Sequence, residues 1–266
     1  MLGAPRRFLT RAVGTAAVVV AVLVVWQAAT AGGLIKPDAL PSMSATVAAL
    51  GRQLGTLSCW QAVGSTLAGW GIGLVIGGVA GIVVGTLIGL SPFAFRSSIP
   101  VIEFFKAVPV IAVLPLAVLL FGTTLRMKFV LVAFGVFWPL TIQVVYGIRS
   151  MDPVVRDTSA VLQVRGLRRL FLVVLPSAAP FIATGLRIGA ATALILDIIT
   201  ELVGGGGGLG LQILKAENSG VGAFPIMYAF IVITGVVGVA ITGCFTLAER
   251  RLLRWHESQR GRQVAA

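Results

Sequence analysis

Six long runs of apolar residues constrain this chain more than any other feature of its sequence. They lie at about 12–31, 63–90, 99–122, 129–148, 180–203 and 223–248. Each run approaches or exceeds the length of about 20 residues that a helix needs to cross a bilayer. Only 11% of the 266 residues are charged, much less than in a soluble domain. We therefore predict an all-α, polytopic membrane protein, with six transmembrane helices in a single domain over residues 1–266.

The first apolar run has a second interpretation, as a secretory signal. Basic residues precede it, and Ala29-Thr30-Ala31 is similar to a signal-peptidase site. However, the run is longer than a usual signal core and further membrane spans follow. We expect an uncleaved first span.

The basic residues indicate how the chain is oriented. Six spans place both termini and the loop 149–179 on one side, with fourteen Lys and Arg residues, against five on the other side. Those five are Lys36, Arg52, Arg126, Lys128 and Lys215. Cytoplasmic loops carry the excess of Lys and Arg, so both termini and the central loop are predicted to be cytoplasmic. This distribution accounts for the net charge of +12, and we expect no nucleic acid partner.

A stripe of glycines runs along the second apolar run. Gly73, Gly77, Gly81, Gly85 and Gly89 recur every four residues and share one face of a helix. Small residues let another membrane helix approach closely. The stripe predicts helix packing rather than a binding site.

The third apolar run combines prolines with charge. Pro100, Pro109 and Pro115 interrupt its backbone hydrogen bonds, and Glu103 and Lys106 are spaced to face each other on a helix. Broken helices at membrane depth are tolerated beside protein or a water-filled path. The flanks are predicted to be a short basic turn at 91–98 and a tight external loop at 123–128.

Charged residues also occur inside the fifth run. Asp197 and Glu201 lie four apart on one helix face, and Arg187 precedes them near the cytoplasmic end. Intramembrane charges are costly, so their default interpretation is functional. Asp197 is the deepest and has to pair, take up a proton or face water. The glycine-rich segment 204–210 follows as an external turn.

The central loop carries most of the cytoplasmic charge. Asp152-Pro153 is typical of a helix start. The residues after it place Ala160, Val164, Leu167 and Phe171 on one helix face, beside several arginines. Such a helix either lies among lipid headgroups or docks onto a partner.

The order of residues in this loop resembles the cytoplasmic loop of ABC importer permeases, which inserts a coupling helix into a cleft of the ATPase. Counted back from Leu175-Pro176, Asp157 stands at the acidic position and Gln163 at the glycine position. With Gln in that place we expect the helix to run on and the bend to shift to Gly166. The resemblance implies an ATPase-coupling set of Asp157, Thr158, Ser159, Ala160, Gln163, Gly166 and Pro176.

Three further blocks resemble the sulfonate, taurine and nitrate subgroup of these permeases. They are Glu103, Lys106 and Pro109 with Leu114-Pro115-Leu116 and Phe121-Gly122; Phe137-Trp138-Pro139 with Gly147-Ile148-Arg149; and Glu201 with Gly208-Leu209-Gly210. This resemblance implies the type I ABC importer (MetI-like) permease fold. It also implies an inner-membrane subunit that moves a small, often anionic solute. Two permease copies, ABC ATPase subunits and an extracytoplasmic solute-binding protein are the implied partners. Our expected translocation-pathway residues are Asp197, Glu201, Glu103, Lys106, Pro109 and Pro115.

Several functions are excluded or left as alternatives. The chain has no P-loop pattern, so ATP and Mg²⁺ are expected only in the partner ATPase and no cofactor in this chain. Two Cys and one His argue against a structural metal site, and no catalytic pattern occurs, so we predict that the chain is not an enzyme. The alternatives are a self-contained secondary transporter or channel, which needs internal repeats that we do not find, and a membrane anchor.

Overall fold

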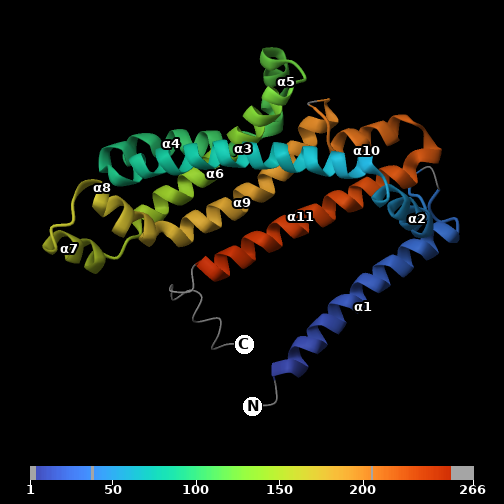
Figure 1. Cartoon of the computed structure of the whole chain (residues 1–266), viewed down its shortest axis with the longest axis horizontal. Coiled ribbons are helices and arrows are strands. Elements are labelled where there is room, and N and C mark those ends of the chain that lie inside the picture. The colour runs from blue at the N-terminus through green and yellow to red at the C-terminus, as the bar shows by residue number, and fades with distance from the viewer. Residues whose placement is uncertain (1–3, 37–38, 205, 253–266) are drawn as a thin grey trace.

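The computed structural model describes residues 4–36, 39–204 and 206–252, and these are helical apart from short connections (Figure 1). The helices in chain order are α1 (Ala4–Ala31), α2 (Met43–Leu54), α3 (Leu57–Leu90), α4 (Pro92–Ala107), α5 (Val110–Phe121), α6 (Leu125–Arg149), α7 (Pro153–Val161), α8 (Gly166–Arg169), α9 (Leu175–Leu202), α10 (Leu209–Asn218) and α11 (Phe224–Leu252). A π-helical turn, η1 (Leu170–Val174), joins α8 to α9, and a 3-10 turn, η2 (Val221–Ala223), precedes α11.

Four helical segments in the described part of the chain are long and apolar enough to cross a membrane. They are Leu57–Leu90, Leu125–Arg149, Gly166–Leu202 and Val221–Leu252. A fifth span is obtained if α4 and α5, which are bent by 86° at their junction, count as one. The first predicted span falls in α1, whose described apolar part, Ala17–Ala31, is shorter than these helices.

Helices α3, α6 and α9 pack side by side and form the centre of the molecule (Figure 1). The glycine stripe of α3 faces α6, as predicted. A Cβ at Gly85 would stand 2.8 Å from the carbonyl oxygen of Thr141, and one at Gly89 would stand 3.0 Å from Cβ of Ile148. Because the stripe has no side chains, the two helix backbones approach closely enough to bury the apolar face of α6.

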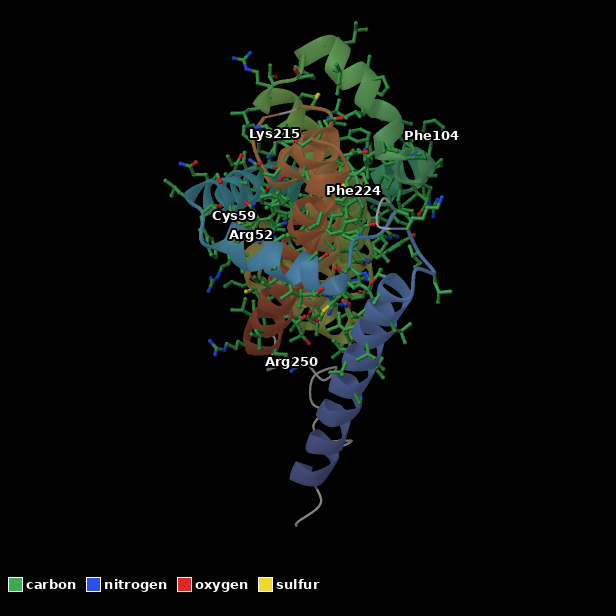
Figure 2. All side chains as sticks on the ribbon, turned by 90° about the vertical axis from the view of Figure 1, so that its right-hand side faces the viewer. Arg52, Cys59, Phe104, Lys215, Phe224 and Arg250 are labelled. Atoms are coloured by element: carbon green, nitrogen blue, oxygen red, sulfur yellow. The ribbon has the colours of Figure 1, made fainter. Side chains whose placement is uncertain are left out.

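The connecting elements gather at opposite ends of the packed helices. Helices α7 and α8 lie at one end, whereas α2 and α10 lie at the other (Figure 1). Figure 2 views the second end, with Arg52 on α2 and Lys215 on α10, and shows α1 extending away from the other helices. The C-terminal end of α1 is held by Trp26, whose indole N–H donates to the carbonyl oxygen of Pro41 at 3.0 Å.

Two predicted loops are wrong because helices begin inside them. The segment 91–98 is not a turn: Ser91 caps α4 by accepting the Ala94 N–H at 3.2 Å, and Pro92 occupies the first turn. This Ser-Pro pair is a typical helix start. Similarly, α6 begins at Leu125, inside the predicted external loop 123–128, and therefore includes Lys128.

Candidate functional site

The central loop begins with the helix that the sequence predicted. Asp152 is the N-cap of α7, and its side chain accepts the Val154 N–H at 2.7 Å. Pro153 follows at the first helical position, where its missing N–H costs nothing. The start of α7 is therefore defined by local sequence alone.

The end of α7 differs from the prediction. The helix stops at Val161, and Gln163 itself adopts a left-handed conformation with φ 55°. The N–H of Gln163 donates to the carbonyl oxygen of Ala160, and that of Val164 to the carbonyl oxygen of Ser159, both at 3.0 Å. These two bonds form a Schellman motif, the helix ending that usually places glycine where Gln163 stands. The expectation that the helix runs on is wrong, although Gly166 also has a positive φ of 58°.

This early ending also breaks the predicted apolar face. Ala160 lies on α7 and Leu167 on α8, with a turn between them, so a single continuous helix face does not form. Instead, the turn presents Val161 and Leu162, with 81% and 69% of their surface exposed. Helix α7, which ends at Val161, lies at one end of the molecule (Figure 1).

The expected coupling residues are distributed unevenly over this surface. Asp157, Thr158 and Ala160 are exposed, whereas Ser159 is buried and donates a hydrogen bond to the carbonyl oxygen of Arg156 at 2.6 Å. Pro176 lies in the first turn of α9, directly after η1, and is exposed. The loop thus offers a small apolar turn flanked by polar groups, with Ser159 supporting it from inside.

A second group of side chains lies inside the helix packing. Lys128 from α6 and Asp197 and Glu201 from α9 are each fully buried, with 0% of the side chain exposed. The Lys128 Nζ lies 2.6 Å from Glu201 Oε1 and 3.3 Å from Asp197 Oδ1. Asp197 therefore has the charged neighbour that a buried carboxylate requires. We refer to these three residues as the buried ionic cluster.

Lys128 is not among the site residues predicted from the sequence, because its position next to Arg126 indicates an external loop. The sequence contains a signal for its position, because two carboxylates inside one span require a cation at a similar depth in the helix packing. Lys128, at the start of the neighbouring span, was a candidate for that cation. The structure corrects its place from the external loop to the interior.

Glu201 also connects the glycine-rich segment 204–210 to the packed helices through hydrogen bonds. Its carboxylate accepts hydrogen bonds from the Thr66 hydroxyl of α3 at 2.9 Å and from the Gly210 N–H at 2.8 Å. The same hydroxyl accepts the Leu209 N–H at 2.9 Å. A Cβ at Gly208 would collide with the Glu201 carboxylate, so that close approach requires glycine. The Gly-Leu-Gly order after the acidic residue follows from this packing.

Asp197 has a different environment from Glu201. Neither of its carboxylate oxygens has a hydrogen-bond partner among the described residues, although the Lys128 ammonium lies nearby. A Cβ at Gly69 of α3 would collide with the Lys128 side chain and stand 2.5 Å from Asp197 Oδ1. Gly69 therefore leaves the space that the buried ionic cluster occupies, and no room remains there for a further group.

The proline-rich run forms a separate site. Glu103 and Lys106 form an ion pair at 2.6 Å on α4, as their spacing predicted, and both are exposed to a similar extent. Val108 is extended, and Pro109 caps α5 without a side-chain hydrogen bond, which produces the sharp bend. Pro115 lies within α5. The structure gives no hydrogen bond or ion pair between this site and the buried ionic cluster in the described ranges.

Relatives of known class share most of this chain. Residues 73–254 match the family described as "Binding-protein-dependent transport system inner membrane component". The putative aliphatic sulfonates transport permease protein SsuC of Bacillus subtilis (strain 168) is 30% identical over 248 residues, covering 90% of this chain and 86% of that protein. The taurine transport system permease protein TauC of Escherichia coli (strain K12) is 29% identical over 255 residues, covering 94% and 91%.

Solved structures of ABC transporters share the fold. A chain of the MetNI methionine ABC transporter, in an inward-facing conformation, matches with a TM-score of 0.58 and 18% identity over 80% of this chain and 98% of that chain. An amino acid ABC transporter with histidines matches with a TM-score of 0.60, also at 18% identity, over 72% and 92%. From the family match and the identity to these permeases, we conclude that this chain belongs to the binding-protein-dependent transport system inner membrane components, the permeases of ABC importers.

Proposed function

We propose that this chain is the permease subunit of an importer in which two copies form the pathway across the inner membrane. Soluble ABC ATPases dock on the central loop and hold the ATP and Mg²⁺, and an external binding protein delivers the solute. The family is described as a binding-protein-dependent transport system component, and SsuC is named as a transport permease protein; both descriptions support this assembly. Family membership does not favour the secondary transporter or channel. Six spans, with both termini cytoplasmic, complete the proposed topology.

The proposed solute is a small anion of the sulfonate, taurine or nitrate type. Support comes from relatives named for aliphatic sulfonates and taurine, and from a nitrate import permease protein NrtB of Leptolyngbya laminosa that is 28% identical over 182 residues. Uptake of radiolabelled taurine, an alkanesulfonate and nitrate by cells with and without the gene tests this assignment. If the deletion strain retains the uptake of all three solutes, the assignment is refuted.

The expected pathway residues form two groups, and we assign a different role to each. Glu103, Lys106, Pro109 and Pro115 belong to the bent pair α4–α5, which carries an exposed ion pair in a segment apolar enough to count as one membrane span. An exposed ion pair there fits a wall of a water-filled path. Asp197 and Glu201 are buried in this chain, so their proposed contribution to the pathway is to set the position of α9 and the external segment.

The proposal on ATPase coupling depends chiefly on the capped and sharply ended α7. A rigid helix with exposed Val161 and Leu162 at its end can enter a cleft of a partner, whereas a helix in headgroups gains nothing from a fixed Schellman ending. Asp157, Thr158 and Ala160 lie beside this end and supply the expected contacts, and Gly166 allows the second turn.

A substitution on the exposed face of α7 tests the docking. We expect Ala160→Trp to reduce co-purification of the partner ABC ATPase by about tenfold, because a large ring on the docking face prevents close approach. The permease should remain in the membrane in normal amount. Asn218→Trp, an equally bulky change on exposed α10 at the opposite end, is the matched control. Equal recovery of ATPase with both variants would show that the loop lies only among headgroups.

A further inference from the structure

A cavity of about 430 Å³ lies between the central loop and the membrane helices. The ends of α3 and α6, the start of α4 and the loop helices α7 and α8 all contribute to it. Three of its lining residues are arginines, namely Arg149, Arg156 and Arg169, and none is acidic. Such a cavity has a strongly positive electrostatic potential.

The three guanidinium groups are not neutralised by the described part of the protein. The ion pairs of the described residues involve none of them. The Nε of Arg169 is buried and has no hydrogen-bond partner among the residues that the structure describes. An unpaired buried donor and a concentration of like charge are both unfavourable, unless an anion supplies acceptors and neutralises the charge.

The arginines are also arranged on a fixed frame. The Arg149 guanidinium lies 4.0 Å from the centroid of the Phe95 ring, which holds it in place by a cation–π contact. Arg156 lies on α7 and Arg169 on α8, two helices joined by the Schellman turn. Guanidinium groups from three separate elements therefore converge on one space.

We propose that this cavity binds a phosphate-type oxyanion. Planar guanidinium groups form paired hydrogen bonds with phosphate and sulfate oxygens, which fits the residues that line the space. The floor carries the apolar Ile148, Leu170 and Val174, near the ends of the spans. Basic pockets at the cytoplasmic ends of membrane helices suit the headgroups of anionic lipids. Free phosphate or sulfate from the cytoplasm presents the same oxygens.

Binding at this place has a consequence for the loop. Arg149 ends the membrane helix α6, whereas Arg156 and Arg169 belong to the loop. A shared anion joins the loop to the span through charge-assisted hydrogen bonds and holds α7 at a fixed distance from the bilayer. Binding of the anion itself needs neither the proposed solute nor the ATPase, because this chain supplies all three arginines.

Native mass spectrometry of the full-length, delipidated chain in detergent tests the proposal, with dioctanoyl phosphatidylglycerol as the probe. We expect one bound lipid per chain, and about tenfold weaker binding after the double change Arg156→Gln and Arg169→Gln. The single change Arg156→Gln, at an exposed position, should weaken binding about threefold without disturbing packing. Arg168 is exposed, precedes Arg169 and does not line the cavity. Arg168→Gln removes the same charge, and its affinity for the lipid should stay within about twofold of that of the unmodified chain.

Competition distinguishes the two sources of the anion. If inorganic phosphate or sulfate displaces the lipid probe from the unmodified chain, the site takes a free oxyanion. If neither displaces it, and dioctanoyl phosphatidylcholine binds about tenfold more weakly, the site takes an anionic headgroup. The proposal is overturned if the double variant binds both phosphatidylglycerol and inorganic phosphate as tightly as Arg168→Gln does.

Discussion

At the scale of single residues, Lys128 is the cation on which the buried ionic cluster depends. It compensates two fully buried carboxylates, and it donates to Glu201 at 2.6 Å. A charge buried without its partner costs far more than the intact pair contributes. The cluster holds one ammonium and two carboxyl groups, so the three residues are not equivalent.

We expect Lys128→Met to destabilise the folded permease by about 3 to 5 kcal/mol, because both carboxylates lose their cation. Asp197→Asn should be tolerated much better, since among the described residues its oxygens accept no hydrogen bond and the change leaves one ammonium with one carboxylate. The thermal unfolding temperature in detergent measures both effects. Lys215→Met, at an exposed position on α10, serves as the control. An unfolding temperature of Lys128→Met equal to that control would contradict this account of the cluster.

At the scale of elements, the end of α7 shows how a helix ending can form without its usual residue. Gln163 occupies a left-handed conformation that costs a side-chain-bearing residue about 1 kcal/mol or more. Two backbone hydrogen bonds of the Schellman motif hold it there. The rest of the loop sets its position, so the turn persists although the local residue disfavours it.

Gln163→Gly should therefore stabilise the turn by about 1 kcal/mol, because glycine has no penalty at positive φ. Hydrogen exchange at the Val164 amide, which donates the longer-range bond of the motif, should become about fivefold slower. Gln163→Ala separates the causes: it removes the side chain but keeps the strain, and it should not slow exchange. Equal exchange rates in the glycine and alanine variants would exclude strain at this residue.

At the scale of the whole molecule, the predicted topology gives the two sides of the membrane different numbers of basic residues. Removing Lys128 from the predicted external count leaves four basic residues there, against fourteen on the predicted cytoplasmic side. The correction strengthens the predicted orientation, because Lys128 interacts with carboxylates and not with the bilayer surface.

Labelling with a membrane-impermeant maleimide tests this orientation. In a Cys244→Ser background, which removes the exposed native cysteine, Asn218→Cys should react in intact cells and Thr158→Cys only after lysis. Thr158 is chosen because it is exposed, whereas neighbouring Ser159 is buried. Reaction of Thr158→Cys from outside intact cells would reverse the topology.

The sequence by itself determined the features that depend on local composition and spacing. The apolar runs, the start of α7 at Asp152, the Glu103–Lys106 pair and the glycine stripe all follow from neighbouring residues in one helix. Membrane length, capping and helical periodicity are local properties. The order of residues in the central loop likewise identified the family.

Tertiary structure alone decided where segments far apart in the chain meet. Lys128, Glu201 and Thr66 come together only because glycines let α3 and α6 approach while α9 packs beside them. The ending at Gln163 likewise depends on how the surrounding chain is held, because a residue with a side chain disfavours the left-handed conformation. The free energy of a buried charge is set by its distance to the opposite charge on another helix, and the spacing of residues along one helix does not contain that distance.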